Sequence, residues 1–214
     1  MHTTIRFLAL LVPLATCLLP PQVALASEPT LYQEEIITLK GVKKVVLDIA
    51  VAELRIRRHT QSELSLKAEL KVKEIDVPLL DRKPAELKVS MERDGEVVRL
   101  KLTKRLARAV LEVVLPSAQP LAIEVSQGVG SIDAELPQGA SAFTLGVGDI
   151  KLKGRRAHLG SITAQVGVGD ISVSGLSTEP SRALVSSSLQ ANGDGSHPLA
   201  AQIGVGSLSL RLEP

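Results

Sequence analysis

Two aspartates in matching glycine-rich segments are the first residues of this chain that could do chemistry. Asp149 and Asp170 each follow Gly-Val-Gly, and some calcium-binding β-repeats use glycine-aspartate turns. Calcium takes six or more oxygen ligands, but these aspartates stand 21 residues apart (149 to 170), and the other copies carry glutamate or serine instead. We therefore expect no metal site and predict that each aspartate caps the backbone of its own turn.

The other potential nucleophiles and ligands form no recognised pattern. No Lys-Ser, Lys-Thr or helix follows the glycines, as a phosphate-binding loop would require. His59, His158 and His197 stand alone, without a second ligand at metal spacing. The run 186–188 is all serine but lacks the Gly-x-Ser-x-Gly context of a hydrolase nucleophile. The sequence predicts no catalytic residue, no cofactor and no metal, and hence a protein that is not an enzyme.

The main enzymatic alternative is a polysaccharide-active enzyme on a β-helix, which would line one groove with acidic and basic residues. The outward positions after each repeat instead change in character from copy to copy. They are Arg55 and Arg57, Asp133 and Glu135, Lys151 and Lys153, Ser172 and Ser174, Gln190 and Asn192, and Ser209 and Arg211. The tightest basic cluster, Lys104, Arg105 and Arg108, is expected to be a solvated loop.

A repeated element must position these side chains, a five-residue segment with the pattern Gly-Val-Gly-Ser/Asp-Ile/Leu. Four copies are separated by 18, 21 and 37 residues (128 to 146, 146 to 167, 167 to 204). Degenerate copies are predicted at 185–189, which divides the longest gap, and at 50–54, where alanine replaces glycine. The predicted structural repeat turns are the glycine pairs Gly128 and Gly130, Gly146 and Gly148, Gly167 and Gly169, and Gly204 and Gly206.

The flanks of each copy have the pattern of two half-buried strands that are out of phase. Around the second copy, Leu145 and Val147 alternate with small residues, and Ile150 and Leu152 alternate with charged ones. Because Val147 and Ile150 are three residues apart, the chain must bend between them, and the glycines allow that bend. The pattern predicts an all-β fold, a β-solenoid-like stack of 18–21-residue coils, with a β-sandwich as the alternative. We expect stacked coils to bury Val129, Val147, Val168 and Val205 against one another.

An irregular insert, about 59–116, separates the copies at 50–54 and 128–132. Residues 62–77 alternate as one strand, and 78–84 read as a loop. Asp94-Gly95, between 87–91 and 97–102, predicts a β-hairpin. No helix with good caps is expected, and the nearest candidate, 101–109, fits strand and loop equally well.

The first 26 residues have the layout of a secretory signal peptide, with cleavage predicted after Ala26. A retained membrane anchor is one alternative, but its apolar run, Phe7 to Leu19, is shorter than the roughly 20 residues that span a bilayer. Lipidation of Cys17 is another alternative. Residues 27–214 are then expected to form a single β-strand-repeat domain, most regular over 117–214, without a disulfide because Cys17 is the only cysteine.

Charge and aromatic content limit the classes of partner. The chain has a formal net charge of +2, which gives no general attraction to nucleic acid. Its first half is mildly basic and its second mildly acidic, as expected for the solvated faces of strands. There is no tryptophan, and after signal removal Tyr32 and Phe143 are the only aromatic residues, so stacking platforms for sugars or single strands are scarce.

The strand pair 45–57, the Leu115-Pro116 and Leu136-Pro137 steps and the repeated turns together resemble a known family. This is the bacterial putative-adhesin family of β-strand-repeat envelope proteins of unassigned function, and the likeness runs from about 41 to 212. The resemblance implies a right-handed β-solenoid-like fold and an envelope or surface location, and it supplies no catalytic residues. The chain departs from the family pattern at 185–188, where serines replace the glycines.

Export, repeats and the lack of a catalytic pattern favour a non-catalytic envelope or cell-surface protein, periplasmic or secreted, that acts as an adhesin or protein-interaction scaffold. The alternative is a regulatory or sensing module for envelope stress. The expected partner is an envelope protein or a glycan, with no nucleic acid and no transmembrane segment after signal cleavage. Self-association through open solenoid ends is a further expectation.

Overall fold

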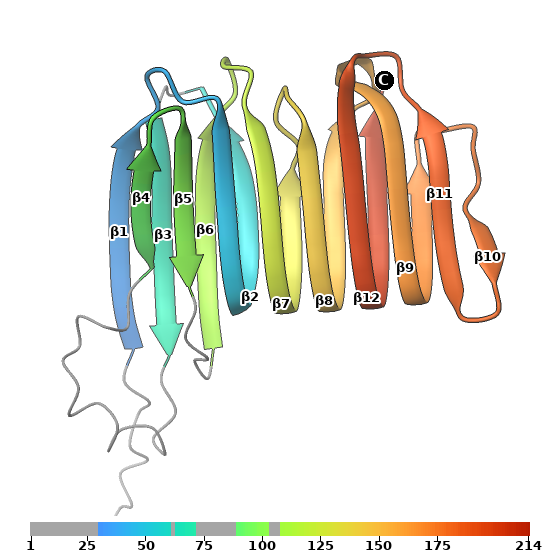
Figure 1. Ribbon diagram of the computed structural model, residues 1–214, viewed down its shortest axis with the longest axis horizontal. Coiled ribbons are helices and arrows are strands. Elements are labelled where there is room, and N and C mark those ends of the chain that lie inside the picture. Colours follow the sequence, from blue (N-terminus) through green and yellow to red (C-terminus); the bar gives the residue numbers. More distant parts are fainter. Residues whose placement is uncertain (1–29, 61–62, 72–88, 103–107) are drawn as a thin grey trace, which may run out of the picture.

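The computed structural model describes residues 30–60, 63–71, 89–102 and 108–214, and these residues form an all-β structure (Figure 1). The strands are β1 (Thr30–Thr38), β2 (Lys44–His59), β3 (Glu63–Lys71), β4 (Ser90–Asp94), β5 (Val97–Leu102), β6 (Arg108–Pro116), β7 (Ala122–Glu135), β8 (Ser141–Arg155), β9 (Leu159–Ser174), β10 (Ser181–Ala183), β11 (Ser186–Asn192) and β12 (His197–Glu213). Within these ranges the only helical element is η3, a 3-10 turn (Arg156–His158). In the described part of the chain, no helix has the length and apolarity to cross a membrane. The expected signal peptide and the loop at 78–84 lie outside the described residues.

All twelve strands join one sheet in the order β1-β3-β6-β2-β7-β8-β12-β9-β11-β10, with the β4–β5 hairpin attached to β2. The five longest strands, β2, β7, β8, β12 and β9, run parallel to one another. Their repeat segments lie in register, so one row joins Ala52, Gly130, Gly148, Gly206 and Gly169. The predicted degenerate copy at 50–54 is thereby confirmed as an equivalent of the glycine copies.

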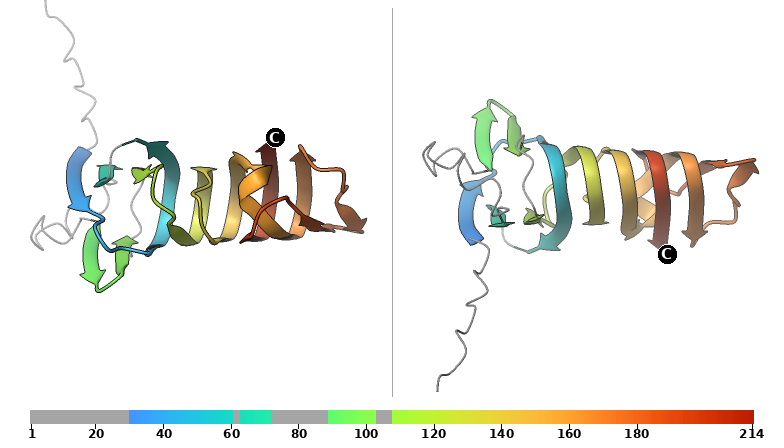
Figure 2. Two further views of the ribbon diagram at one scale, coloured as in Figure 1. Left: turned by 90° about the horizontal axis from the view of Figure 1, so that it is seen from above. Right: turned by 90° about the horizontal axis from the view of Figure 1, so that it is seen from below.

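Each of these five strands bends at its repeat segment and contributes to two facing walls (Figure 2). In β7 the buried side chains are 123, 125 and 127 before the bend and 132 and 134 after it, so the predicted change of phase is confirmed. We call the parts before the bend, together with β4, β5, β10 and β11, the first wall. The parts after the bend, together with β1, β3 and β6, are the second wall.

The core lies between the walls and is built from columns of aliphatic side chains. One column joins Leu54, Ile132, Ile150, Leu208 and Ile171, which are neighbours in register and are all buried. Each buried side chain of this size stabilises the fold by about 1.5–3 kcal/mol relative to leaving it in water. Because each strand covers the apolar face of the next, no single repeat could bury its own face.

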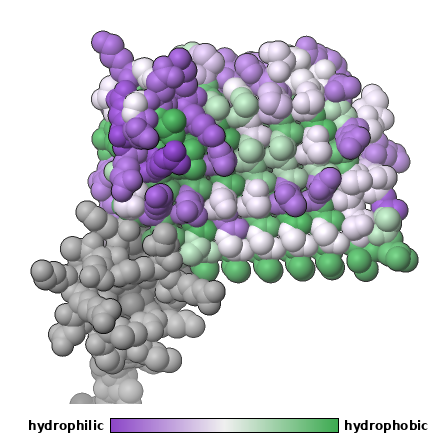
Figure 3. Space-filling model, viewed as in Figure 1, coloured by the Kyte–Doolittle hydropathy of each residue, from purple (hydrophilic) through white to green (hydrophobic). Residues whose placement is uncertain are grey.

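The valine of each glycine repeat lies outside the core, so the prediction that the coils bury it is wrong. Val129, Val147, Val205 and Val168 are neighbours in register, but each is 47–49% exposed. The chain turns inward on both sides of the bend, and a residue at the apex therefore points to solvent. These four residues form an apolar line in register, which we call the valine ridge. Figure 3 shows a row of hydrophobic residues along the lower edge of the molecule.

The order of the strands in space differs from their order in the chain. The C-terminal strand β12 lies between β8 and β9, so the connections 156–160 and 193–197 cross. There Gly193 N–H donates to Gly160 O and Gly195 N–H donates to Leu159 O, both at 2.7 Å. A Cβ at Gly195 would overlap the backbone of His158, so the crossing requires glycine.

The copy predicted at 185–189 does not form a bend of the repeat type. Ser186–Asn192 is β11, which pairs antiparallel with the first-wall part of β9 and places Ser187 opposite Val166. A tight turn at Leu184 and Val185 connects it to β10, and Leu184 has a φ of +50°. The chain therefore reverses direction here, which the spacing of the repeats could not reveal because spacing is the same for parallel and antiparallel strands.

The strand predicted at 62–77 is present over residues 63–71, which form β3, and its remaining residues lie outside the described ranges. Strand β3 is antiparallel to both β1 and β6. Asp94-Gly95 is confirmed as the turn of the β4–β5 hairpin, with Gly95 at a φ of +57°. Strand β1 was not expected, and most of the helix candidate at 101–109 lies outside the described residues.

Candidate binding surface

The eight predicted turn glycines lie at the bends in two rows. One row joins Gly128, Gly146, Gly204 and Gly167, and the other joins Gly130, Gly148, Gly206 and Gly169. The second row has φ values from +133° to +144°, a region open mainly to glycine. These residues have no side chain with which to bind, so any function belongs to the surfaces that they hold in place.

The two aspartates after the glycines bond to neighbouring segments, which corrects the prediction that each caps its own turn. Asp149 Oδ1 accepts hydrogen bonds from the backbone N–H of Ser207 at 3.1 Å and from its hydroxyl at 2.6 Å. Asp170 forms an ion pair with Arg182 of β10. In the described ranges, no group of three or more His, Cys, Asp or Glu residues is placed to hold a metal ion. The two carboxylates thus join adjacent strands.

The outer face of the second wall carries charges of both signs on adjacent strands. Arg55, Asp133 and Lys151 are neighbours in register on β2, β7 and β8. The guanidinium of Arg57 donates two hydrogen bonds to the Asp133 carboxylate, at 3.1 and 3.0 Å. This hydrogen bonding lowers the pKa of Asp133 and raises the pKa of Arg57. Along the row of Arg55, Asp133 and Lys151 the side-chain charge changes sign from one strand to the next. This alternation agrees with the prediction that the outward positions form no uniform groove.

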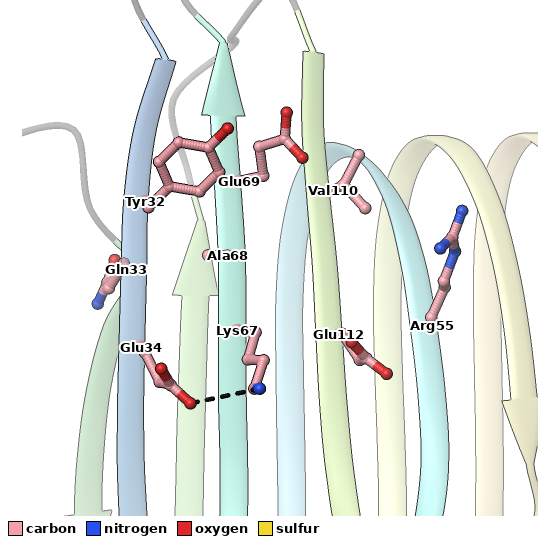
Figure 4. A pocket seen from close by; sticks show the side chains of 9 residues that line it. All are labelled: Tyr32, Gln33, Glu34, Arg55, Lys67, Ala68, Glu69, Val110 and Glu112. Atoms are coloured by element: carbon pink, nitrogen blue, oxygen red, sulfur yellow. Dashed lines mark ion pairs between the residues drawn. The ribbon is translucent and has the colours of Figure 1, made fainter.

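A shallow depression of about 430 Å³ opens on this face where β1, β3, β6 and β2 lie side by side (Figure 4). Its lining includes Tyr32, Glu34, Arg55, Lys67, Glu69 and Glu112. The tyrosine is 78% exposed, so its ring is available to a ligand. Lys67 and Glu34 form an ion pair at 3.4 Å across the floor. Carboxylates can accept and cations can donate hydrogen bonds here, beside one apolar ring.

Sequence analysis did not identify this depression. The nine residues that line it come from three strands of the insert and upstream region and one repeat strand. No motif links them, and the only signal was that Tyr32 is one of the few aromatic residues. They meet because β3 pairs with both β1 and β6.

The three consecutive serines hold the β10–β11 hairpin in place. The hydroxyl of Ser186 donates to Ala183 O at 3.1 Å, and that of Ser187 donates to Gly169 O at 2.9 Å. Ser188 shares a hydrogen bond of 2.8 Å with the Ser181 hydroxyl. Each of the three hydroxyls thus takes part in a hydrogen bond within β10 and β11 or to β9.

Two of the three isolated histidines come together in the structure. His197 begins β12 in register with Leu159, next to His158 of η3. Burial, followed by the charges of Arg58, Arg155 and His197, lowers the pKa of His158. Sequence reasoning missed this group because it depends on the insertion of β12 beside β9. His59 is the last residue of β2.

No protein-family model and no curated protein matches the chain. Among solved structures it is similar to a putative cell adhesion protein from Clostridium sporogenes, with a TM-score of 0.55 and 15% identity, covering 86% of this chain and all 100% of that one. A putative adhesin from Bacteroides fragilis has a TM-score of 0.34 and 12% identity, covering 86% of this chain and 98% of that one. The structural neighbours are therefore bacterial putative adhesins and cell adhesion proteins, in agreement with the family that the repeats resemble, and the likeness to the first is one of fold.

Proposed function

We propose that this chain is a non-catalytic, exported, adhesin-like protein that binds a glycan at the depression beside Tyr32. The observation that carries the proposal is an exposed tyrosine ring set among carboxylates and cations on an outer wall. Aromatic rings pack against the C–H faces of sugars, and charged side chains form strong hydrogen bonds with hydroxyl groups. The one surface aromatic of the described chain thus lies where a saccharide unit could use it.

The scaffold in this proposal is a right-handed β-solenoid-like stack of coils. Its support is the in-register alignment of five parallel strands that bend at the same row. Neighbouring strands lie about 4.7–4.9 Å apart, so outward side chains keep fixed positions. Such preorganised contacts reduce the entropy lost when a ligand binds.

The proposed location is the cell surface or periplasm. The expected signal peptide, residues 1–26, supports export, although it lies outside the described residues. The description of the Clostridium sporogenes neighbour as a putative cell adhesion protein also favours a surface or exported protein. Fractionation of cells that express the full chain should recover it, shortened by about 26 residues, outside the cytoplasm, and full-length protein in the cytosol would contradict export.

Binding of a glycan panel by the purified chain tests the function, with affinities measured by titration calorimetry. Tyr32→Ala should weaken binding about tenfold, because the stacking surface is lost. Ile36→Ala is the matched control, since Ile36 is also exposed on β1, at 62%, but does not line the depression. It should leave the affinity unchanged.

Three results would count against the proposal. Equal losses of glycan affinity in the two variants would show that the depression is not the binding site, and so would a parent chain that binds no glycan. Release of new sugar ends from the panel would indicate the polysaccharide-active enzyme. Altered envelope-stress signalling on deletion, without glycan binding, would favour the sensing module.

A further inference from the structure

A second recess, of about 400 Å³, lies at the end of the second wall, where β2, β7 and β8 finish and η3 begins. It shares no residue with the depression beside Tyr32. Its charged and titratable lining consists of Arg58, Glu135, Lys153, Arg155, His158 and Glu213. Strands β2, β7, β8 and β12 and the turn η3 supply these groups.

Arg58 is a charged residue at a position that faces the core. Residues 54 and 56 of β2 point into the core, and residue 58 lies on the same side of the strand. The positions in register with it on the two adjacent segments are the uncharged Leu136 and Gly154. A cation at such a position needs hydrogen-bond acceptors to offset its burial. Its Nη2 donates to Ser117 O at 2.8 Å, but its Nε is buried and has no partner among the described residues.

The Nε–H group of Arg58 is a hydrogen-bond donor with no acceptor among the described residues. Buried donors nearly always have a partner, and leaving one unsatisfied is unfavourable. The recess places the Arg58 side chain beside three further basic groups, Lys153, Arg155 and His158. Lys153 and Arg155 form no ion pair within the described part of the chain.

The carboxylates of the recess do not balance this charge. Glu135 Oε2 already accepts the backbone N–H of Arg58 at 3.1 Å, and Glu213 lies in register beside Arg155. Three permanent cations thus face two carboxylates. The pKa of His158 is lowered by burial and then by Arg58 and Arg155, which is the response of an imidazole to nearby positive charge.

We propose that this recess binds an oxyanion, a phosphate or sulfate group carried by an acidic ligand. The Arg58 side chain lines the recess, and Lys153 and Arg155 add two further permanent positive charges to its lining. Guanidinium groups suit such anions because their planar donors can bond to two oxygens at once. The proposal is independent of the glycan site, since either site could be lost while the other is kept.

The first test is an NMR titration of the purified full chain with inorganic phosphate and with sulfate, following the imidazole signals of His158. Saturable shifts are expected, and bound anion should raise the pKa of His158 because a negative neighbour favours the protonated ring. Shifts that grow linearly without saturation, or an unchanged pKa, would overturn the proposal.

Paired variants separate a site from a general charge effect. Arg155→Gln should weaken phosphate binding about tenfold, and Glu213→Gln should strengthen it by removing a competing carboxylate. Lys151→Gln is the matched control, because Lys151 is an exposed cation on the same strand that lines a different groove. Equal weakening by the Arg155 and Lys151 variants would refute a specific site.

A further comparison identifies the source of the anion. The parent chain and the Arg155 variant are mixed with phosphatidylglycerol vesicles, with phosphatidylcholine vesicles and with a soluble phosphorylated oligosaccharide. Binding to phosphatidylglycerol that the variant loses would indicate a lipid headgroup, and binding only to the oligosaccharide would indicate a soluble acidic glycan. Binding to none of them, together with no saturation by phosphate, would overturn the proposal.

Discussion

Replacing Gly148 by alanine should destabilise the fold strongly. Gly148 has a φ of +136°, and an alanine Cβ there would lie 1.7 Å from the carbonyl oxygen of Gly130 on the adjacent strand. The backbone conformation alone costs a residue with a side chain about 1–3 kcal/mol. Relief of the overlap must also part β7 and β8 at their bends, so we expect a total loss of about 3–5 kcal/mol.

Urea denaturation followed by circular dichroism measures this loss. With a slope of about 1–3 kcal/mol per molar urea, the midpoint should fall by at least about 1 M. Gly95→Ala is the control, because Gly95 also has a positive φ, +57°, but no atom lies within 4 Å of its added Cβ. It should cost about 1–2 kcal/mol. Equal midpoints for the two variants would refute the claim that close stacking of backbones governs the bends.

Other variants test the core, an ion pair and the crossing. Val147→Ser should shift the urea midpoint little because Val147 is half exposed, whereas Ile150→Ala should cost about 2–5 kcal/mol; similar losses would contradict the assignment of the valine ridge. Arg57 lowers the pKa of Asp133 in the folded state, so the pair stabilises the fold above the ordinary aspartate pKa and loses this effect as pH falls through the lowered value. Asp133→Asn should therefore reduce the change in the free energy of unfolding between neutral and acid pH. The reduction should be small, because both side chains are about a third exposed. An unchanged pH dependence of the free energy of unfolding would argue against this contribution. Gly195→Ala should speed hydrogen exchange of β12 amides, because its Cβ would overlap the crossing connection; unchanged protection would show that the crossing tolerates a side chain.

The strands and bends were predictable because they depend on local pattern. Alternation of apolar and polar residues marks a half-buried strand, and the change of parity between Val147 and Ile150 requires a bend wherever the chain runs. The hairpin at Asp94-Gly95 is equally local, since a two-residue turn depends on the conformations open to those two residues.

The orientation of the valines was not predictable from the same pattern. Leu145 and Val147 share a parity, and Leu145 is buried, so alternation placed Val147 inside as well. The bend begins between them, at Gly146, and turns the second residue to solvent. Alternation describes an extended strand and gives no information on where within a glycine-rich segment the direction changes.

The candidate sites were even less accessible to sequence analysis. Tyr32 and Glu112 are 80 residues apart (32 to 112) but line one depression because β3 lies between their strands. Arg58 and Arg155 line one recess for a similar reason. Neither group forms a motif, because pairing of distant strands brings them together.

The sequence by itself determined that this chain forms β-strands with equivalent bends, because glycine conformations and side-chain alternation are properties of a few consecutive residues. Only the tertiary structure decided which strands are neighbours. The segments at Gly148, Gly169 and Gly206 have nearly the same local pattern, so each could pair with either of the others. The return of the chain through β10 and β11 places β12 between β8 and β9, and the faces that could bind a partner depend on that order.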